Sequence, residues 1–291
     1  MEKQFDIENL HCSYDKGLTA SSKVVLEIDR LVIPRGKTVF IVGGSGIGKS
    51  TILEVLGMMN NTIVPTPGMR FVYYEGEKAF DLIEMWRRND DEELSSFRLK
   101  YFSFIFQSTN LMRNFTAFEN IALTRMLQGY SQGECFEKTR DLLSDLGLGH
   151  IDDTRMAQEL SGGQQQRLTF ARAILPDFSV LFGDEPTGNL DGDNAVKAME
   201  LLAAKLNTYP DSSAVIVSHD MHLATSFADM IILIRKHARK ELNKHGEVDF
   251  YGRIDESSVF FPDEKRENWS NGPESFETEA FEYYLKKGGQ V

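Results

Sequence analysis

Residues 43–50 read Gly43-Gly44-Ser45-Gly46-Ile47-Gly48-Lys49-Ser50, and Thr51 follows them. A glycine, four further residues and then Gly-Lys-Ser form the pattern of a phosphate-binding loop. Its glycines allow backbone N–H groups to converge on phosphate oxygens at the start of a helix. Lys49 adds a mobile positive charge for the β- and γ-phosphates, and the Ser50 hydroxyl can bind Mg²⁺. The stretch therefore predicts a nucleotide site.

The segments on either side of this loop decide between a phosphate site and a glycine-rich turn that only joins two elements. Residues 38–42 have the length and β-branched content of a buried strand. From Ser50 to Leu56 apolar side chains recur at helical spacing. Strand, loop and helix in this order are what the phosphate-binding mechanism requires, so they favour the nucleotide site.

The rest of the chain alternates between short apolar runs and amphipathic stretches. We expect strands at 5–10, 24–28, 71–74, 79–83, 180–182, 214–217 and 230–234, a loop at 60–70, a partly helical stretch at 86–100, and helices at 117–148, 161–175, 195–206 and 221–227. This alternation predicts an α/β fold with a mostly parallel sheet, a small antiparallel β subdomain and an inserted helical subdomain.

An acidic pair follows the predicted strand at 180–182. Asp184 and Glu185 come at its carboxyl end, where ligands of open α/β sheets gather. Asp184 can bind Mg²⁺, and Glu185 can polarise a water for in-line attack on the γ-phosphate. The alternative is an acidic pair that simply ends a strand at the surface.

A second helix start has the character of an anion site. Ser161 is a predicted N-cap, followed by Gly162, Gly163 and Gln164 and then by good helix formers. A hydroxyl and uncovered backbone N–H groups at a helix start attract a phosphate. One cradle would bind the nucleotide of its own chain, and the other would close on the nucleotide of a second copy.

These motifs together resemble the ATP-binding subunit of ABC transporters, over about residues 5–235. The matching pieces occur in the family's order, which is more specific than any one of them. They are Tyr14, the loop Gly43 to Thr51, Gln107 after the apolar run Phe102 to Phe106, Leu160-Ser161-Gly162-Gly163-Gln164, Asp184-Glu185, Asn189-Leu190-Asp191 and His219. The resemblance implies a P-loop NTPase core at 1–235, a helical subdomain at about 108–160, and ATP with Mg²⁺ as the bound groups.

The family also implies roles for residues that the pattern alone does not assign. Tyr14 would stack on adenine, Gln107 would sense the metal and the lytic water, Asp191 would couple the two sites, and His219 would contact the γ-phosphate. The catalytic set is then Glu185, His219 and Gln107, and the metal set is Ser50, Gln107 and Asp184. Tyr14 could instead be a core residue, and Gln107 an ordinary surface amide.

Two other interpretations of the histidine region fail on geometry. Ser218, His219 and Asp220 are adjacent, so they cannot point at one another as a hydrolytic triad requires. His219 and His222 could pair as metal ligands, but no third ligand is close in the sequence.

A finer resemblance rests on short sequences around these motifs. They are Phe106-Gln107, Asn110-Leu111, Thr116-Ala117, Glu119-Asn120 and Pro186-Thr187-Gly188-Asn189-Leu190-Asp191. They are similar to the branch that serves lipoprotein release, macrolide export and bacterial cell division. Members of that branch are homodimers beneath integral membrane subunits. The segment from Asn60 to Lys100 and the tail from about Lys236 depart from its pattern.

Composition narrows the function classes. The 291 residues include 44 acidic and 32 basic side chains, a formal charge of −12 that argues against sequence-independent nucleic-acid binding. No segment approaches the roughly 18 consecutive apolar residues that a membrane-spanning helix needs. The start of the chain lacks the pattern of a signal peptide. Its two cysteines, Cys12 and Cys135, lie far apart and without the spacing of metal ligands, which favours a reducing compartment. We therefore expect a cytoplasmic location, and the resemblance to the ABC transporter subunit implies that it is peripheral, on the cytoplasmic face of the inner membrane.

The C-terminal extension, residues 236–291, differs from the rest. Residues 255–291 carry nine acids and four bases, a balance of 4 − 9 = −5. From Pro273 to Gly288 the order of proline, early acids, late lysines and glycine predicts a short helix. Its apolar face would consist of Phe276, Ala280, Tyr283 and Tyr284.

The leading hypothesis is an ATPase subunit of an ABC transporter that dimerises around two Mg·ATP and drives a separate membrane protein. The helical stretch from Gln107 to Leu148 would receive that protein. One alternative is a soluble ABC-type ATPase that remodels a cytosolic complex. Another is a regulatory module that binds ATP and barely hydrolyses it. The sequence does not identify the transported substrate.

Overall fold

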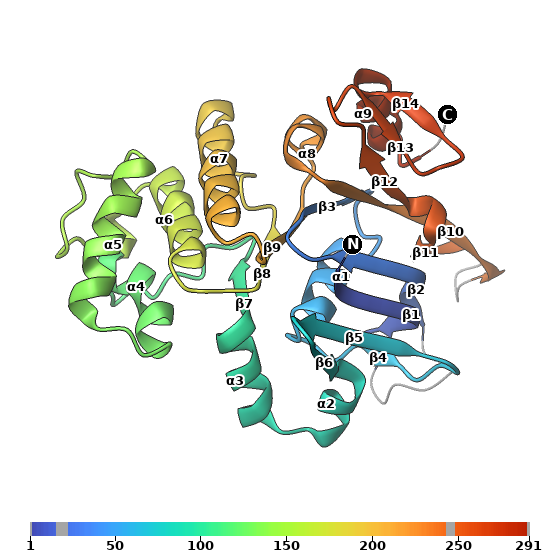
Figure 1. Cartoon of the computed structure of the whole chain (residues 1–291), viewed down its shortest axis with the longest axis horizontal. Coiled ribbons are helices and arrows are strands. Elements are labelled where there is room, and N and C mark those ends of the chain that lie inside the picture. The colour runs from blue at the N-terminus through green and yellow to red at the C-terminus, as the bar shows by residue number, and fades with distance from the viewer. Residues whose placement is uncertain (1, 16–22, 243–247, 290–291) are drawn as a thin grey trace. The chain divides into compact units, whose positions relative to one another are not determined.

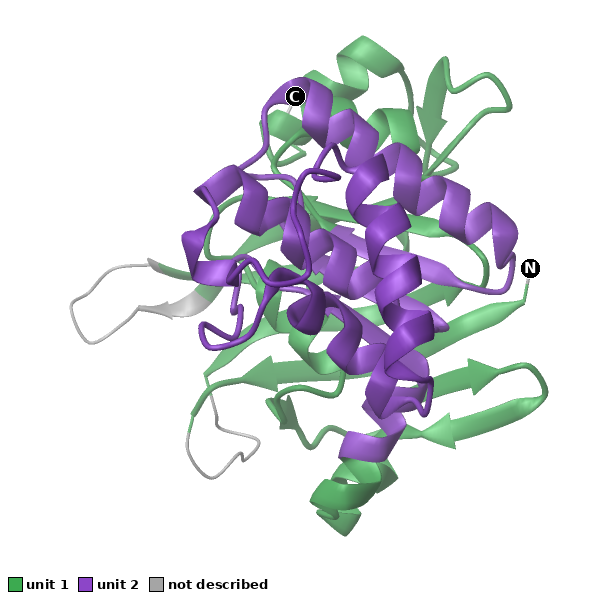
Figure 2. Ribbon diagram, turned by 90° about the vertical axis from the view of Figure 1, so that its left-hand side faces the viewer, with its two compact units in different colours: residues 1–94, 217–291 green, residues 95–216 purple. Residues whose placement is uncertain are grey.

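A computed structural model describes residues 2–15, 23–242 and 248–289. The chain divides into two compact units, which Figure 2 shows in different colours. The first contains Met1–Leu94 and Val217–Val291, and the second contains Ser95–Ile216.

The first unit is built on a mixed sheet in the order β6-β5-β1-β2-β11-β10-β3. Its strands are β1 (Lys3–Ser13), β2 (Val24–Pro34), β3 (Thr38–Gly43), β5 (Arg70–Glu75), β6 (Lys78–Asp81), β10 (Met230–Leu242) and β11 (Val248–Ile254), with the short β4 (Ile63–Val64) beside β1. The strands β1, β2, β5 and β6 are antiparallel neighbours, whereas β3 pairs with β10 and β2 with β11 in parallel. The predicted α/β class, with its small antiparallel part, is confirmed.

Strand β3 explains the position of the glycine-rich loop. All six of its residues are buried, as expected of a strand covered on both faces. The helix α1 (Lys49–Leu56) follows directly, with Ile52, Val55 and Leu56 buried. The predicted sequence of strand, loop and helix is therefore confirmed.

The segment after β5 corrects a predicted boundary. A strand was expected to continue to Ile83, but β6 ends at Asp81 and α2 (Leu82–Arg88) begins. The Asp81 carboxylate accepts hydrogen bonds from the backbone N–H groups of Ile83 and Glu84, at 3.0 and 3.1 Å. This N-cap favours the helix over the strand. The charged stretch that follows ends α2 and forms α3 (Asp91–Tyr101).

The C-terminal residues contain more strands than the sequence indicated. After β11 come β12 (Val259–Pro262), β13 (Asn268–Ser270), β14 (Ser275–Glu277) and α9 (Thr278–Lys286), which Figure 1 shows together in red. Phe276, predicted on the helix, lies in β14 instead. Its ring stacks on Tyr284 with centroids 4.5 Å apart, and Trp269 stacks on Phe281 at 5.3 Å. This aromatic core holds β12 to β14 and α9 together.

The second unit combines three strands with a group of helices. The strands are β7 (Phe102–Ile105), β8 (Val180–Asp184) and β9 (Ser213–Val217), and the helices are α4 (Ala117–Leu127), α5 (Gln132–Asp145), the one-turn η1 (Ala157–Glu159), α6 (Gly162–Ile174) and α7 (Gly192–Thr208). Strands β7 and β8 are parallel. The predicted helical stretch 117–148 is two helices, separated near Gly129, whose φ is +100°.

The other predicted helices of the chain agree closely with the structure. Helix α8 (Met221–Phe227) has the predicted bounds, and α6 ends at Ile174, just before Pro176. Within the residues described above, no helix is both long enough and apolar enough to span a membrane.

Candidate functional site

The glycine-rich loop has the backbone geometry that its sequence predicts. Gly43, Gly46 and Gly48 have φ values of +154°, +72° and +97°, which side chains with a Cβ rarely adopt. A Cβ on Gly43 would lie 2.9 Å from the backbone carbonyl oxygen of Ile234, so space also favours glycine there. Gly48 is the N-cap of α1 and makes no side-chain cap hydrogen bond. The positive end of a helix dipole at such a glycine-capped start attracts an anion.

Lys49 is held inside this loop. Its side chain is buried, and Nζ donates hydrogen bonds to the carbonyl oxygens of Gly43 and Gly44 at 3.0 and 2.7 Å. An ammonium group on a flexible stem can turn from these carbonyls to a phosphate without moving the backbone. The structure thus places the predicted cation within the predicted loop.

The loop forms one wall of a cavity of about 520 Å³. Gly43, Gly44, Ser45 and Ile47 line it together with His219. His219 lies between Ser218, whose backbone N–H donates to the Ile41 carbonyl at 3.4 Å, and Asp220, which caps α8 through the Leu223 N–H. The structure therefore brings His219 to the loop, as the resemblance implied.

Tyr14 lies beside the first turns of α1. Its hydroxyl is 3.0 Å from both Thr51 Oγ1 and Glu54 Oε2, and the side chain is 53% exposed. Burial of the hydroxyl, with a smaller effect of the Glu54 carboxylate, raises the pKa of Tyr14 above its ordinary value. The hydroxyl is thus anchored on α1 while the residue stays open to a ligand. Stacking on adenine stays a prediction.

In the second unit, Glu185 of the acidic pair lies next to Gln107. Gln107 follows β7 and Glu185 follows β8, so both lie at the carboxyl ends of neighbouring parallel strands. Gln107 Nε2 donates a hydrogen bond to Glu185 Oε2 at 3.5 Å. A carboxylate beside an amide can accept a proton from a water that the amide also contacts.

Glu185 has an unusual backbone conformation. Its φ is +51°, in the left-handed region that costs a non-glycine residue about 1 kcal/mol or more. The following turn is closed by a hydrogen bond from the Gly188 N–H to the Glu185 carbonyl at 3.1 Å. A strained backbone conformation of this kind persists only where contacts with the surrounding structure hold the residue in a fixed position.

The helix start at Ser161 is a capping box. Ser161 Oγ accepts a hydrogen bond from the Gln164 N–H at 3.4 Å, and Gln164 Oε1 accepts from the Ser161 N–H at 2.9 Å. Apart from neighbouring residues and the backbone of the helix itself, no atom lies within 4 Å of a Cβ built on Gly162 or Gly163. The backbone at the start of α6 is therefore open, although the serine hydroxyl already contributes to the cap.

Asp191 caps the other long helix of this unit. Its carboxylate accepts hydrogen bonds from the backbone and side-chain N–H groups of Asn194, at 3.0 and 2.8 Å. These hydrogen bonds, the backbone one first, hold the pKa of Asp191 below its ordinary value. Asp191 is thus charged at neutral pH, and its coupling role stays a prediction.

The predicted metal ligands Ser50 and Asp184 each offer an oxygen, and their binding of Mg²⁺ stays a prediction. Among the residues that the structure describes, no three or more His, Cys, Asp or Glu side chains form a metal cluster. Ser50 is exposed in the first turn of α1, and Asp184 is half-buried at the end of β8. Mg²⁺ at a nucleotide takes one or two such oxygens and fills its shell with phosphates and waters.

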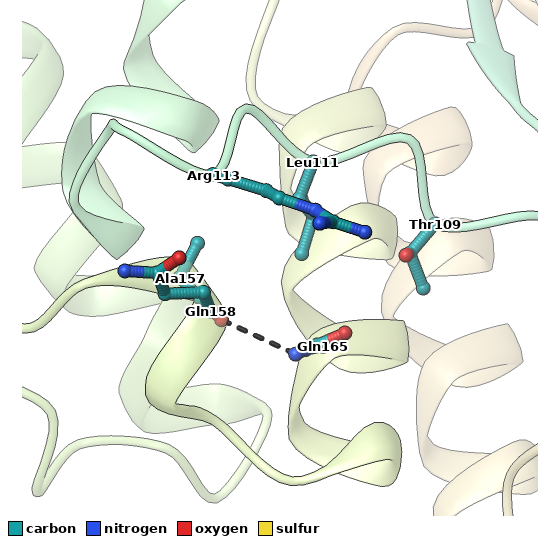
Figure 3. Close-up of a pocket in the computed structure, with 6 residues that line it drawn as sticks. All are labelled: Thr109, Leu111, Arg113, Ala157, Gln158 and Gln165. Atoms are coloured by element: carbon teal, nitrogen blue, oxygen red, sulfur yellow. Dashed lines mark hydrogen bonds between the residues drawn. The ribbon is translucent and has the colours of Figure 1, made fainter.

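The sequence did not reveal a second cavity, of about 340 Å³, in the second unit. Figure 3 shows Arg113, from the loop after β7, and Gln165, from α6, among the side chains around it. Gln165 Nε2 donates hydrogen bonds to the carbonyls of Ala157 and Leu160, at 3.4 and 3.0 Å. The predicted partner-binding stretch includes Arg113 but not Gln165, because their proximity arises only in the fold.

Comparison with known proteins finds relatives that are described as ATP-binding proteins of transport systems. The family described as ABC transporter matches residues 26–188. The chain is 33% identical to the lipoprotein-releasing system ATP-binding protein LolD of Colwellia psychrerythraea, over 82% of this chain and 86% of that protein. It is 37% identical to the macrolide export ATP-binding/permease protein MacB of Campylobacter fetus, over 79% of this chain but only 33% of that longer protein.

Solved structures of similar fold include the dimeric MJ0796, described as a bacterial ABC transporter cassette. Its TM-score is 0.65 at 30% identity, and the match covers 78% of this chain and 93% of that one. A second dimeric structure of MJ0796, in a post-hydrolysis state bound to ADP and Pi, matches with the same values.

Proposed function

Because the chain belongs to the ABC transporter family and is an ATPase of that family, we propose that two copies enclose two Mg·ATP and drive a separate membrane protein. The observation that carries the proposal is the loop at 43–50. It combines left-handed glycines, a helix start whose N-cap is a glycine, and the buried Lys49, and it lines one cavity. These are the features that bind a triphosphate.

The nucleotide is bound mainly by the first unit in this proposal. The N–H groups of the loop and Lys49 bind the phosphates, Tyr14 stacks on the base, and His219 contacts the γ-phosphate. Ser50, Gln107 and Asp184 would hold Mg²⁺, which would supply positive charge against the phosphates. Catalysis then depends on positioning and on charge neutralisation.

Hydrolysis is assigned to the pair at the ends of β7 and β8. Glu185 accepts a proton from the attacking water, and Gln107 orients that water through its amide. The 3.5 Å contact between Gln107 Nε2 and Glu185 Oε2 supports this assignment, because the two side chains are close enough to contact the same water. The strained backbone of Glu185 supports it further, since strain concentrates at reacting groups.

The second copy contributes the start of α6. Ser161, Gly162 and Gly163 face the γ-phosphate of the partner's ATP in this proposal, and Asp191 couples the two sites. The open backbone at Gly162 and Gly163 supports an approach of this kind. The MJ0796 structures, at 30% identity, are described as dimeric, which supports the presence of a second copy.

Two substitutions at Ser161 separate its cap from its proposed contact with phosphate. Ser161→Asp keeps an N-cap acceptor, so stability should change by less than about 0.5 kcal/mol, whereas Ser161→Ala should cost about 1 kcal/mol. The aspartate adds a negative charge opposite the partner's phosphate, so ATP-dependent dimerisation should be lost in Ser161→Asp. Thermal unfolding and light scattering measure the two effects. A Ser161→Asp variant that dimerises normally would remove Ser161 from the interface.

A membrane partner is assigned to the second unit. The cavity beside Arg113 and Gln165, and a further cavity of about 260 Å³ near Phe104, Asn120 and Arg172, offer recesses for a partner segment. The relatives are named as ATP-binding proteins of a lipoprotein-releasing system and of macrolide export. These names support a location on the cytoplasmic face of the inner membrane.

Co-purification decides between this proposal and a soluble ABC-type ATPase. A tagged chain isolated from detergent-solubilised membranes should retain an integral membrane protein in a fixed ratio. If the chain is recovered only with cytosolic proteins, the membrane role is wrong and the remodelling alternative is favoured.

A further inference from the structure

The cavity beside the phosphate loop is completed by the C-terminal segment. Besides Gly43, Gly44 and Ser45, its lining includes Lys236 of β10 and Lys286 and Lys287 at the end of α9. All of these residues belong to the first unit. The end of the acidic extension thus lies at the proposed triphosphate site.

Specific contacts hold α9 in this position. Glu282 accepts a hydrogen bond from Thr225 Oγ1 of α8 at 2.7 Å. Arg235 donates to the Tyr284 hydroxyl at 3.2 Å. Gly289 has a φ of +80°, and a Cβ there would lie 2.8 Å from Leu233 Cδ2. The end of α9 is therefore tied to α8 and to β10, the strand that pairs with β3.

The same segment approaches the loop at a second point. Gly252 of β11 lies so close to the loop that a Cβ on it would overlap the Ile47 carbonyl oxygen. Only a glycine leaves room for this approach. The extension therefore packs directly against the loop as well as completing its cavity.

The charges around the cavity favour an anion. Its lining contains three lysines and His219, and no Asp or Glu. Lys286 and Lys287 are exposed, and within the described part of the chain neither makes an ion pair. Lys287 Nζ lies 5.5 Å from the centre of the Tyr283 ring, a weak contact that a phosphate can replace. Two of the four bases in residues 255–291 thus lie at this one cavity.

We propose that Lys286 and Lys287 bind the terminal phosphate of the nucleoside triphosphate held by the loop, and so favour ATP over ADP. This inference rests on the proposed function, since it concerns the same site. Each lysine has a flexible stem and three donors, which suits a phosphate presented by another element. The competing explanation is structural: lysines in the last turn of a helix also stabilise its carbonyl end.

Equilibrium binding of fluorescently labelled ATP and ADP to the full chain tests the proposal. In the double variant Lys286→Gln/Lys287→Gln, the Kd for ATP should rise about tenfold, as expected for two partly solvated charge contacts. The Kd for ADP should change by less than about twofold, because ADP lacks the contacted phosphate. The matched control Lys78→Gln/Lys265→Gln removes the same charge away from the cavity, and it should bind both nucleotides like the wild type.

The other possible outcomes contradict either the contact between the lysines and the terminal phosphate or the proposed function itself. If the Kd for ATP is unchanged, or if ATP and ADP weaken equally, the lysines do not contact the terminal phosphate. The variant Lys286→Arg/Lys287→Arg keeps both charges, so it must retain the ATP affinity of the wild type. Thermal unfolding must show that α9 still folds in both double variants. If the wild-type chain itself binds no ATP, the proposed function fails and not only this inference.

Discussion

Replacing Glu185 by Gln is expected to lower steady-state ATP hydrolysis by about a thousandfold, within the range for loss of a general base. The amide has the same size as the carboxylate but cannot accept the proton of the attacking water. The left-handed backbone of Glu185 tolerates Gln no worse than Glu, because both are unbranched at Cβ. ATP binding should therefore stay within about twofold of the wild type, since the phosphates are bound by the loop.

A phosphate-release assay measures this effect, and Glu200→Gln supplies the control. Glu200 is an exposed acid of α7 in the same unit, so its substitution removes one charge without touching the proposed site. It should hydrolyse ATP at the wild-type rate. Wild-type hydrolysis by Glu185→Gln would show that another group is the base.

Replacing Lys49 by Ala is expected to weaken ATP binding by about a hundredfold, through loss of charge-assisted hydrogen bonds to the phosphates. Lys49 is 7% exposed and directs its ammonium group onto the loop carbonyls of Gly43 and Gly44. Its stem fills space at the start of α1, so some stability should also be lost. Fluorescence titration with labelled ATP measures the affinity, and thermal unfolding measures the stability.

The control for this variant is Lys37→Ala, at the other end of β3. Lys37 precedes the first residue of the strand, so the length of β3 separates it from the loop. Its loss should leave the Kd for ATP unchanged. If Lys49→Ala binds ATP like the wild type while remaining folded, the loop at 43–50 is not the phosphate site.

Local signals predicted the part of the fold that holds the loop. The apolar run before Gly43 and the helical spacing after Lys49 are properties of neighbouring residues, and the structure confirms both elements. The proximity of Gln107 to Glu185 could also be inferred from the sequence, because the carboxyl ends of parallel strands lie at one edge of the sheet. Their catalytic roles remain predictions.

The C-terminal segment could not be predicted in the same way. Phe276 was placed on a helix by its sequence neighbours, but it pairs in β14 opposite Trp269. The contact of Gly252 with Ile47 joins residues more than 200 positions apart, which no local pattern records. Lys286 and Lys287 were interpreted only as the positive end of a helix, and their position at the cavity depends on how α9 packs on α8.

The mass of the Glu185→Gln variant in solution, with and without Mg·ATP, tests the central claim most directly. Sedimentation velocity with labelled ATP reports both the mass and the nucleotide bound. We predict a monomer without ATP, and with ATP a particle of twice the mass that carries two nucleotides and is abolished by adding Ser161→Asp. If the variant remains monomeric at saturating Mg·ATP and binds one nucleotide per chain, the proposed dimer is contradicted.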